Sequence, residues 1–227
     1  MNYKRIVPNS ISSVSLMLGV LSIFKTMEGD FFWAPVCIVL SVIADSLDGR
    51  AARLLHVQGE FGKELDSLCD LGAFGVAPAI MIYKYGLAEL GCAGMFIASL
   101  FTVFGAMRLA RFNVNAAEIH GYFQGMPIPA GACFLAAYVL SGFHFPAWYT
   151  ALMTLAIALI LYSSVKFPDF KGKDGMRLYP LPVALGAAMG AYLLWLRPAA
   201  VPFAAMFAYT AAGILNSVYA CLLQKEK

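Results

Sequence analysis

Long apolar runs divide almost the whole chain into segments of the length that crosses a bilayer. A transmembrane helix needs about 20 predominantly apolar residues. Eight runs of roughly this length predict eight helices, over residues 9–27, 31–55, 62–86, 88–112, 127–143, 146–165, 180–197 and 201–223. Because no long polar tract separates these runs, the pattern predicts an all-α integral membrane protein with a single domain over residues 1–227.

The composition agrees with this interpretation. The chain of 227 residues is 61% hydrophobic and 13% charged, with a mean hydropathy of +0.74. Soluble domains are nearer half apolar and a quarter charged. The formal net charge of +3 is small, so we expect no nucleic-acid partner.

Lysine and arginine are unevenly shared between the two sets of helix ends. Of the 16 such residues, Lys25, Lys84 and Arg197 fall at one set of ends, and all the others fall at the opposite set. Loops rich in Lys and Arg stay in the cytoplasm. We therefore expect both termini and the polar ends of the second and third helices on the cytoplasmic side of the cell membrane.

Four aspartates lie where the second and third apolar runs meet. Asp45 and Asp48 are three residues apart, and Asp66 and Asp70 are four apart, so each pair shares one face of its helix. A short turn between the helices would bring the pairs together. A single aspartate here could be a helix cap or a paired charge, but four clustered carboxylates are costly beside a membrane, and hard divalent cations are their natural partners.

The residues around these aspartates follow the pattern D-x2-D-G-x2-A-R-x8-G-x3-D-x3-D, with fixed positions at Asp45, Asp48, Gly49, Ala52, Arg53, Gly62, Asp66 and Asp70. The pattern resembles the signature of the CDP-alcohol phosphotransferase family at every fixed position. The resemblance implies the helical bundle of that family. It also implies a reaction in which an alcohol attacks the lipid-side phosphate of a CDP-lipid and CMP leaves, assisted by two divalent cations, Mg²⁺ or Mn²⁺.

The same resemblance assigns roles to the four aspartates. Asp45, Asp48 and Asp66 are expected metal ligands. Asp70 is the expected general base and is also included among the metal-binding residues. A positioned carboxylate helps because a hydroxyl is a poor nucleophile at neutral pH.

Five further residues are candidates for binding the CDP-lipid. The planar guanidinium of Arg53 suits a phosphate. Small residues at Gly49, Ala52 and Gly62 would let the nucleotide approach the backbone, although small residues also serve tight helix packing in membranes. Asn9, at the start of the first apolar run, is expected to line the site or to cap its helix.

Three further segments resemble the phosphatidylserine synthases within this family: Arg108–Asn113, Met126–Ala130 and Lys166–Lys171. This implies CDP-diacylglycerol as donor and L-serine as acceptor. Arg108, Arg111 and Lys166 are candidates to hold the serine carboxylate, although basic clusters at cytoplasmic helix ends also arise from topology and lipid-headgroup contact alone. The resemblance further implies a homodimer surrounded by membrane lipids.

Two other functions stay open at this point. The acceptor could be glycerol 3-phosphate, inositol or inositol phosphate, or the donor an archaeal-type ether lipid, because basic residues suit each of these. A cation-coupled transporter is the alternative of a different class. It predicts carboxylates near the bilayer midplane and symmetry between the two halves, whereas these carboxylates cluster at one edge of the first half.

Overall fold

Helices make up nearly all of the computed structural model, which describes residues 3–55, 57, 59–115, 122–168 and 179–225. The α-helices are α1 (Tyr3–Glu28), α2 (Trp33–Leu54), α3 (Glu60–Asp70), α4 (Ala77–Ile82), α5 (Cys92–Asn115), α6 (Ile128–Leu140), α7 (Ala147–Tyr162), α8 (Pro180–Leu196) and α9 (Val201–Lys225). Each apolar run in the sequence falls on a helix, which confirms the predicted helical membrane fold.

Four helical segments are long and apolar enough to cross a membrane: Ile6–Glu28, Glu60–Leu90, Cys92–Val114 and Val201–Ala220. Shorter apolar helices cover Ile128–Leu140, Ala147–Tyr162 and Pro180–Leu196. α2 is 22 residues long and ends in the charged stretch that carries the first two aspartates of the motif. The protein is therefore a multi-pass membrane protein, with a polar end on α2.

The third predicted span is one continuous helical run that changes its winding. α3 passes into a π-helical turn, η1 (Leu71–Val76), then α4, a second π-helical turn, η2 (Tyr83–Leu87), and a short 3₁₀ turn, η3 (Ala88–Leu90). The hydroxyl of Thr102 on α5 donates to the carbonyl of Gly75 inside η1 at 3.0 Å. π-helical turns often mark functional sites, and η1 begins directly after Asp70.

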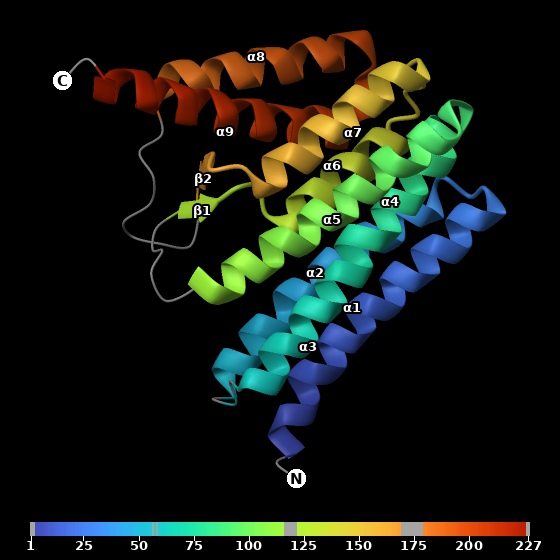
Figure 1. The fold of residues 1–227 in the computed structure, drawn as a ribbon, viewed down its shortest axis with the longest axis vertical. Helices are drawn as coiled ribbons and strands as arrows, with labels where there is room; N and C mark the ends of the chain where they lie inside the picture. Colours follow the sequence, from blue (N-terminus) through green and yellow to red (C-terminus); the bar gives the residue numbers. More distant parts are fainter. Residues whose placement is uncertain (1–2, 56, 58, 116–121, 169–178, 226–227) are drawn as a thin grey trace.

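α1 and α2 form a closely packed pair beside this run (Figure 1). The hydroxyls of Ser15 and Ser41 lie 2.7 Å apart, and each also donates to the other residue's carbonyl. Gly19 lets α1 approach η1, because a Cβ at this position would lie 2.6 Å from Cα of Ala73. Small residues are what allow such backbone contact between membrane helices, and here they fix α1 against the segment that follows Asp70.

Two short strands form a feature that the hydrophobic pattern does not predict. β1 (Tyr122–Gln124) pairs antiparallel with β2 (Lys166–Pro168), with Phe123 opposite Phe167. Arg111 on α5 links this pair of strands to the end of α7, because its guanidinium donates to the carbonyls of Tyr162, Ser163 and Gln124. The ends of α5 and α7 are thereby joined to β1.

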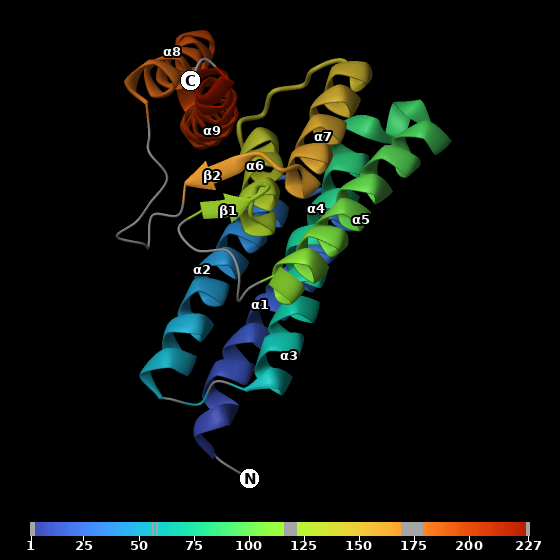
Figure 2. The same ribbon diagram turned by 60° about the vertical axis from the view of Figure 1, so that its left-hand side comes forward.

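α8 and α9 form a hairpin that crosses the other helices at a steep angle. α1 to α7 run side by side in Figure 1, whereas α8 and α9 lie at a steep angle to them at the upper left, and the hairpin is seen nearly end-on beside α6 in Figure 2. Gly186 and Gly190 on α8 face α9, where an added Cβ would lie 2.9 Å and 3.0 Å from backbone carbonyls. α9 in turn contacts α6 and β2, so this GxxxG pattern packs within the chain.

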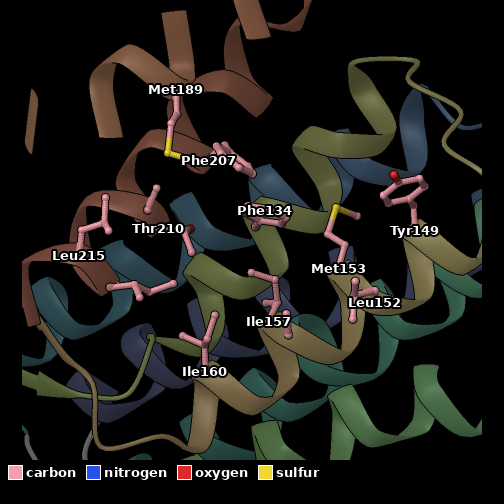
Figure 3. Close-up of a pocket in the computed structure, with 13 residues that line it drawn as sticks. Phe134, Tyr149, Leu152, Met153, Ile157, Ile160, Met189, Phe207, Thr210 and Leu215 are labelled. Carbon is pink, nitrogen blue, oxygen red and sulfur yellow. The ribbon is translucent and has the colours of Figure 1, made fainter. Parts of the chain in front are cut away.

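An apolar cavity of about 440 Å³ lies between this hairpin and the bundle (Figure 3). Side chains from α6, α7, α8 and α9 line it, among them Phe134, Ile157, Met189 and Phe207. Thr210 and Tyr149 contribute hydroxyl-bearing side chains, but no described lining residue is acidic or basic. The cavity therefore lacks the groups that a reaction at phosphorus requires, and the candidate site lies elsewhere.

Candidate active site

Three carboxylates from two helices meet at the polar end of the α2–α3 pair. Asp45 and Asp48 come from the last turns of α2, and Asp66 comes from α3. One carboxylate oxygen of each lies within 4.8 Å of the others. Asp48 is buried, with 6% of its surface exposed, and the other two are half-buried. Such a group of hard oxygen donors has the chemistry that Mg²⁺ and Mn²⁺ prefer, so we call Asp45, Asp48 and Asp66 the acidic triad.

α1 orients one member of the acidic triad. The hydroxyl of Ser12 donates to Oδ2 of Asp48 at 2.6 Å and also lies 3.1 Å from the carbonyl of Pro8. Hydrogen bonds of this kind hold a carboxylate in one orientation, as the outer partners of metal ligands do. The sequence analysis did not identify Ser12. The sequence feature that could have identified Ser12 is its position three residues after Asn9, because this spacing places both residues on one face of α1.

Asp70 lies one turn beyond Asp66 and outside the acidic triad. Its charge interacts with those of Asp45, Asp66 and Arg108. Its Oδ1 atom is buried and has no hydrogen-bond partner among the described residues. Asp70 is therefore placed beside the triad with one oxygen still able to accept a proton or a hydrogen bond.

Arg108 of α5 interacts electrostatically with Asp70, and its guanidinium lies 5.5 Å from the centre of the Phe112 ring. Only 6% of Arg108 is exposed, and its Nε atom is buried without a hydrogen-bond partner in the described part of the chain. Within that part, no ion pair of 4.0 Å or less joins its guanidinium to Asp70. Buried charges of opposite sign that are near each other but unpaired call for an explanation, and a polar ligand that contacts both would supply one.

The end of α5 also fixes the position of α3. Nζ of Lys63 donates to the carbonyl of Asn113 at 3.0 Å. Nδ2 of Asn113 donates to the hydroxyl of Ser67 at 2.8 Å. Because Lys63 and Ser67 flank Asp66 on α3, these bonds fix α3 against the end of α5 and so help to set the position of Asp66.

The candidates for binding the CDP-lipid lie on the same three helices. A Cβ at Gly62 would lie 3.4 Å from Oδ1 of Asn9, so α1 and α3 come close together there. On α2, a Cβ at Gly49 would lie 3.6 Å from Nη1 of Arg53, so the exposed guanidinium of Arg53 lies over this glycine. Ala52 is half-buried beside them. The structure thus places these small residues on the helices that form or support the triad, with the exposed guanidinium of Arg53 beside Gly49.

The three basic candidates for the acceptor differ in their surroundings. Arg111 donates to three backbone carbonyls, and its guanidinium lies 4.6 Å from the centre of the Tyr162 ring. Lys166 pairs with Gln124 through the backbone of β2. Its side chain lies outside the described residues, as does the rest of its segment from residue 169. Of the two whose side chains are described, Arg108 is the buried one, and its Nε atom has no described partner.

Comparison with known proteins decides the family. The sequence profile of the CDP-alcohol phosphatidyltransferase family matches residues 5–162, which include the four aspartates and both arginines of α5. The chain belongs to this family. It is therefore an enzyme of the CDP-alcohol phosphotransferase type, and the transporter alternative is wrong.

Curated relatives are similar over most of the chain. A CDP-diacylglycerol–serine O-phosphatidyltransferase of Helicobacter pylori is 37% identical over 208 residues, covering 83% of this chain and 88% of the relative. One of Bacillus subtilis is 34% identical, covering 75% of this chain and 93% of the relative. An archaetidylserine synthase of Methanothermobacter thermautotrophicus is 34% identical, covering 76% of both chains. Acceptors other than serine do not occur in these three names.

Proposed function

We propose that this family member transfers the phosphatidyl group of CDP-diacylglycerol to the hydroxyl of L-serine, forming phosphatidylserine and CMP. The observation that carries the proposal is a pair of buried polar atoms, one on α3 and one on α5, that belong to electrostatically interacting side chains. Oδ1 of Asp70 and Nε of Arg108 both lack a partner among the described residues. Free serine carries a carboxylate for the guanidinium and a hydroxyl proton for the carboxylate. The names of the relatives favour the same acceptor.

The acidic triad would hold the divalent cations, Mg²⁺ or Mn²⁺, on which we expect the reaction to depend. Its three carboxylates come within 4.8 Å of one another, and the Ser12 hydroxyl steadies the most buried of them. When bound, such ions supply positive charge that offsets the charge of the diphosphate and of the transition state. Asp70 has a separate role in this proposal because it lies outside the triad.

Asp70 is the proposed general base. As the serine hydroxyl oxygen attacks the lipid-side phosphorus, its proton passes to Asp70. The bond between that phosphorus and the oxygen bridging to CMP then breaks, and the electron pair leaves with CMP. Arg108 would hold the serine carboxylate, since a guanidinium can bind both carboxylate oxygens at once. Arg111 keeps its bonds to the backbone in this mechanism.

The donor would lie against the α1–α2–α3 face. Arg53 is the proposed phosphate ligand, because it is exposed and close to the triad on α2. Gly49, Ala52 and Gly62 would leave room for the nucleotide, and Asn9 would line its edge next to Gly62. The acyl chains would pass between the helices into the bilayer, where their burial needs no enclosed cavity.

Three wider features belong to the same proposal. Residues 1–227 would act as a single domain, which the contacts of α9 with α6 and β2 support. The uneven Lys and Arg distribution supports a cytoplasmic active site with both termini on that side. A homodimer is proposed from the family resemblance.

The proposal is tested by incubating the purified protein with CDP-diacylglycerol, Mg²⁺ or Mn²⁺, and a panel of acceptors while CMP release is followed. The panel contains L-serine, serinamide, glycerol 3-phosphate, inositol and inositol phosphate, and an ether-linked CDP-lipid is tested as a second donor. We expect L-serine to give the highest kcat/KM and EDTA to abolish release until metal is restored. A higher kcat/KM with another acceptor would replace serine, and full activity after exhaustive chelation would overturn the metal role.

A further inference from the structure

A threonine of α5 binds a carbonyl inside the π-helical turn that follows Asp70. The hydroxyl of Thr102 donates to the carbonyl of Gly75 at 3.0 Å. Gly75 is buried within η1, and Thr102 is half-buried. At the end of η1, the backbone N–H of Ala77 bonds to the carbonyl of Gly72, five residues earlier, which is the π-helical spacing. Hydroxyl side chains satisfy backbone carbonyls where a membrane helix departs from regular winding, so the Thr102 bond helps to hold η1 in its π form.

Other described contacts of η1 are close but apolar. α1 lies against the turn at Gly72, where an added Cβ would clash with the side chain of Leu16. A Cβ at Gly75 would lie 2.9 Å from the side chain of Leu71 and 3.7 Å from that of Ile128 on α6. Apolar packing limits how far the turn can move, whereas a hydrogen bond also requires a direction. The Thr102 hydroxyl is therefore the contact that selects the orientation of a carbonyl in η1.

Asp70 is the acidic residue on which the conformation of η1 acts most directly. It is the last residue of α3, and η1 begins at Leu71. Its Oδ1 atom is buried without a hydrogen-bond partner among the described residues, so the position of this oxygen depends on the backbone that carries it. Asp66 lies one turn further from η1, and the bond from Asn113 to Ser67 ties α3 to α5 beside it. A change in η1 should therefore displace Asp70 more than the acidic triad.

We propose that Thr102 is a positioning residue that holds η1 in its π form and thereby keeps Asp70 directed at the hydroxyl of the acceptor. This inference rests on the proposed function, because it takes Asp70 as the general base. Thr102 lies 32 positions after Asp70 in the chain, outside the aspartate motif. Its part in the reaction arises only from the packing of α5 against η1.

Turnover of two Thr102 variants tests the inference. Thr102→Val keeps the branched shape of the side chain and removes only the hydroxyl, whereas Thr102→Ser keeps the hydroxyl. For Thr102→Val we expect CMP release at saturating serine to fall about 3- to 10-fold, the usual effect of losing one hydrogen bond. Thr102→Ser should restore most of this turnover. Metal-dependent binding of CDP-diacylglycerol should be unchanged in both variants, because the acidic triad keeps its geometry.

Ser99→Ala is the matched control. Ser99 lies three residues before Thr102 on the same face of α5, and both line a groove of about 380 Å³ between α5 and the segment that contains Val76 and Tyr83. The Ser99 hydroxyl donates to the carbonyl of Met95 within α5 at 2.8 Å, so its loss leaves η1 unchanged. Ser99→Ala should alter neither turnover nor donor binding. Equal losses of turnover in Ser99→Ala and Thr102→Val would overturn the inference, because the effect would then belong to the groove.

A double variant shows whether Thr102 acts through Asp70. If it does, Thr102→Val should lower turnover no further in a protein that already carries Asp70→Asn. The same fold-decrease in both backgrounds would overturn the inference, and so would unchanged turnover in Thr102→Val alone. A joint loss of turnover and donor binding in Thr102→Val would also overturn it, because the acidic triad would then be displaced as well.

These measurements keep the two proposals apart. A wild-type protein that releases no CMP with serine disproves the proposed acceptor. The Thr102 variants are then compared on the acceptor that the panel identifies, since every alcohol must give up its hydroxyl proton. Near-normal turnover in Asp70→Asn overturns the general base and the positioning role together. A large loss in Asp70→Asn with normal turnover in Thr102→Val overturns the positioning role alone.

Discussion

Replacing Asp66 and Asp70 by asparagine, one at a time, should give two different defects. Asp66→Asn removes one of three carboxylates whose oxygens lie within 4.8 Å of one another. A cation held by the triad would then lose the attraction of one negative charge a few ångströms away. Two unit charges 4 Å apart attract by about 4 kcal/mol at an effective dielectric of 20, which is a lower bound for a divalent cation. We therefore expect metal binding, and with it donor binding, to weaken by roughly 10³-fold.

Asp70→Asn should affect turnover instead. The acidic triad is intact in this variant, because Asp70 lies outside it, so the donor should bind with near-normal affinity. Asparagine cannot accept the proton of the serine hydroxyl. We expect turnover to fall by ~10²–10⁴-fold, the usual contribution of a general base.

Two measurements on each variant separate these defects: metal-dependent binding of CDP-diacylglycerol, and CMP release at saturating serine. Glu64→Gln is the control, because Glu64 is an exposed acid on the same helix and should change neither quantity. Loss of donor binding in Asp70→Asn as severe as in Asp66→Asn would make Asp70 chiefly a metal ligand. Near-normal turnover in Asp70→Asn would mean that another group or water takes the proton.

Three further predictions concern support, sidedness and packing. Ser12→Ala should raise the metal concentration for half-maximal CMP release about 10-fold, whereas Ser13→Ala, which removes an exposed hydroxyl, should not; equal effects would argue against orientation of the triad by α1. In intact cells, an impermeant thiol reagent should label Cys92 in a variant that lacks the other four native cysteines. It should not label a cysteine placed at Glu60 in a variant that lacks all five, and the reverse pattern would invert the topology. Gly19→Ala should lower the free energy of unfolding by about 1–3 kcal/mol, measured by thermal or denaturant unfolding in detergent, and an unchanged stability would show that α1 can shift away from η1 at no cost.

The helices and the acidic triad were predictable because both depend on local spacing. Apolar runs near bilayer length gave the spans, and the spacing of Asp45 and Asp48 on α2 put two carboxylates on one face. The sequence could not give contacts between distant segments. Pairing of β1 with β2 joins residues more than 40 positions apart, and the bond from Ser12 to Asp48 crosses from α1 to α2.

The two arginines of α5 show the same limit within one motif. Arg108 and Arg111 are three residues apart and look alike as candidates for an anionic acceptor. Their difference arises from their neighbours: Arg111 donates to the carbonyls at the end of α7, whereas Arg108 is buried, lies over the ring of Phe112 and has no partner for its Nε atom among the described residues. Only the packing of α5 against α7 and η1 distinguishes Arg111, which binds the backbone, from Arg108, the proposed acceptor ligand.

The π-helical turn η1 changes the direction in which side chains point along the continuous helical run from α3 to η3. A π-helical turn accommodates an additional residue, and one residue corresponds to about 100° of rotation around a helix. Side chains after Val76 are therefore out of phase with Asp66 and Asp70 on an ordinary helical wheel. The acidic face of α3 and the apolar face of the helical run after η1 can thus point in different directions. Loss of one residue between Leu71 and Val76 could be absorbed by conversion to regular α-helix, whereas the same loss between Asp66 and Asp70 would turn one carboxylate away from the other.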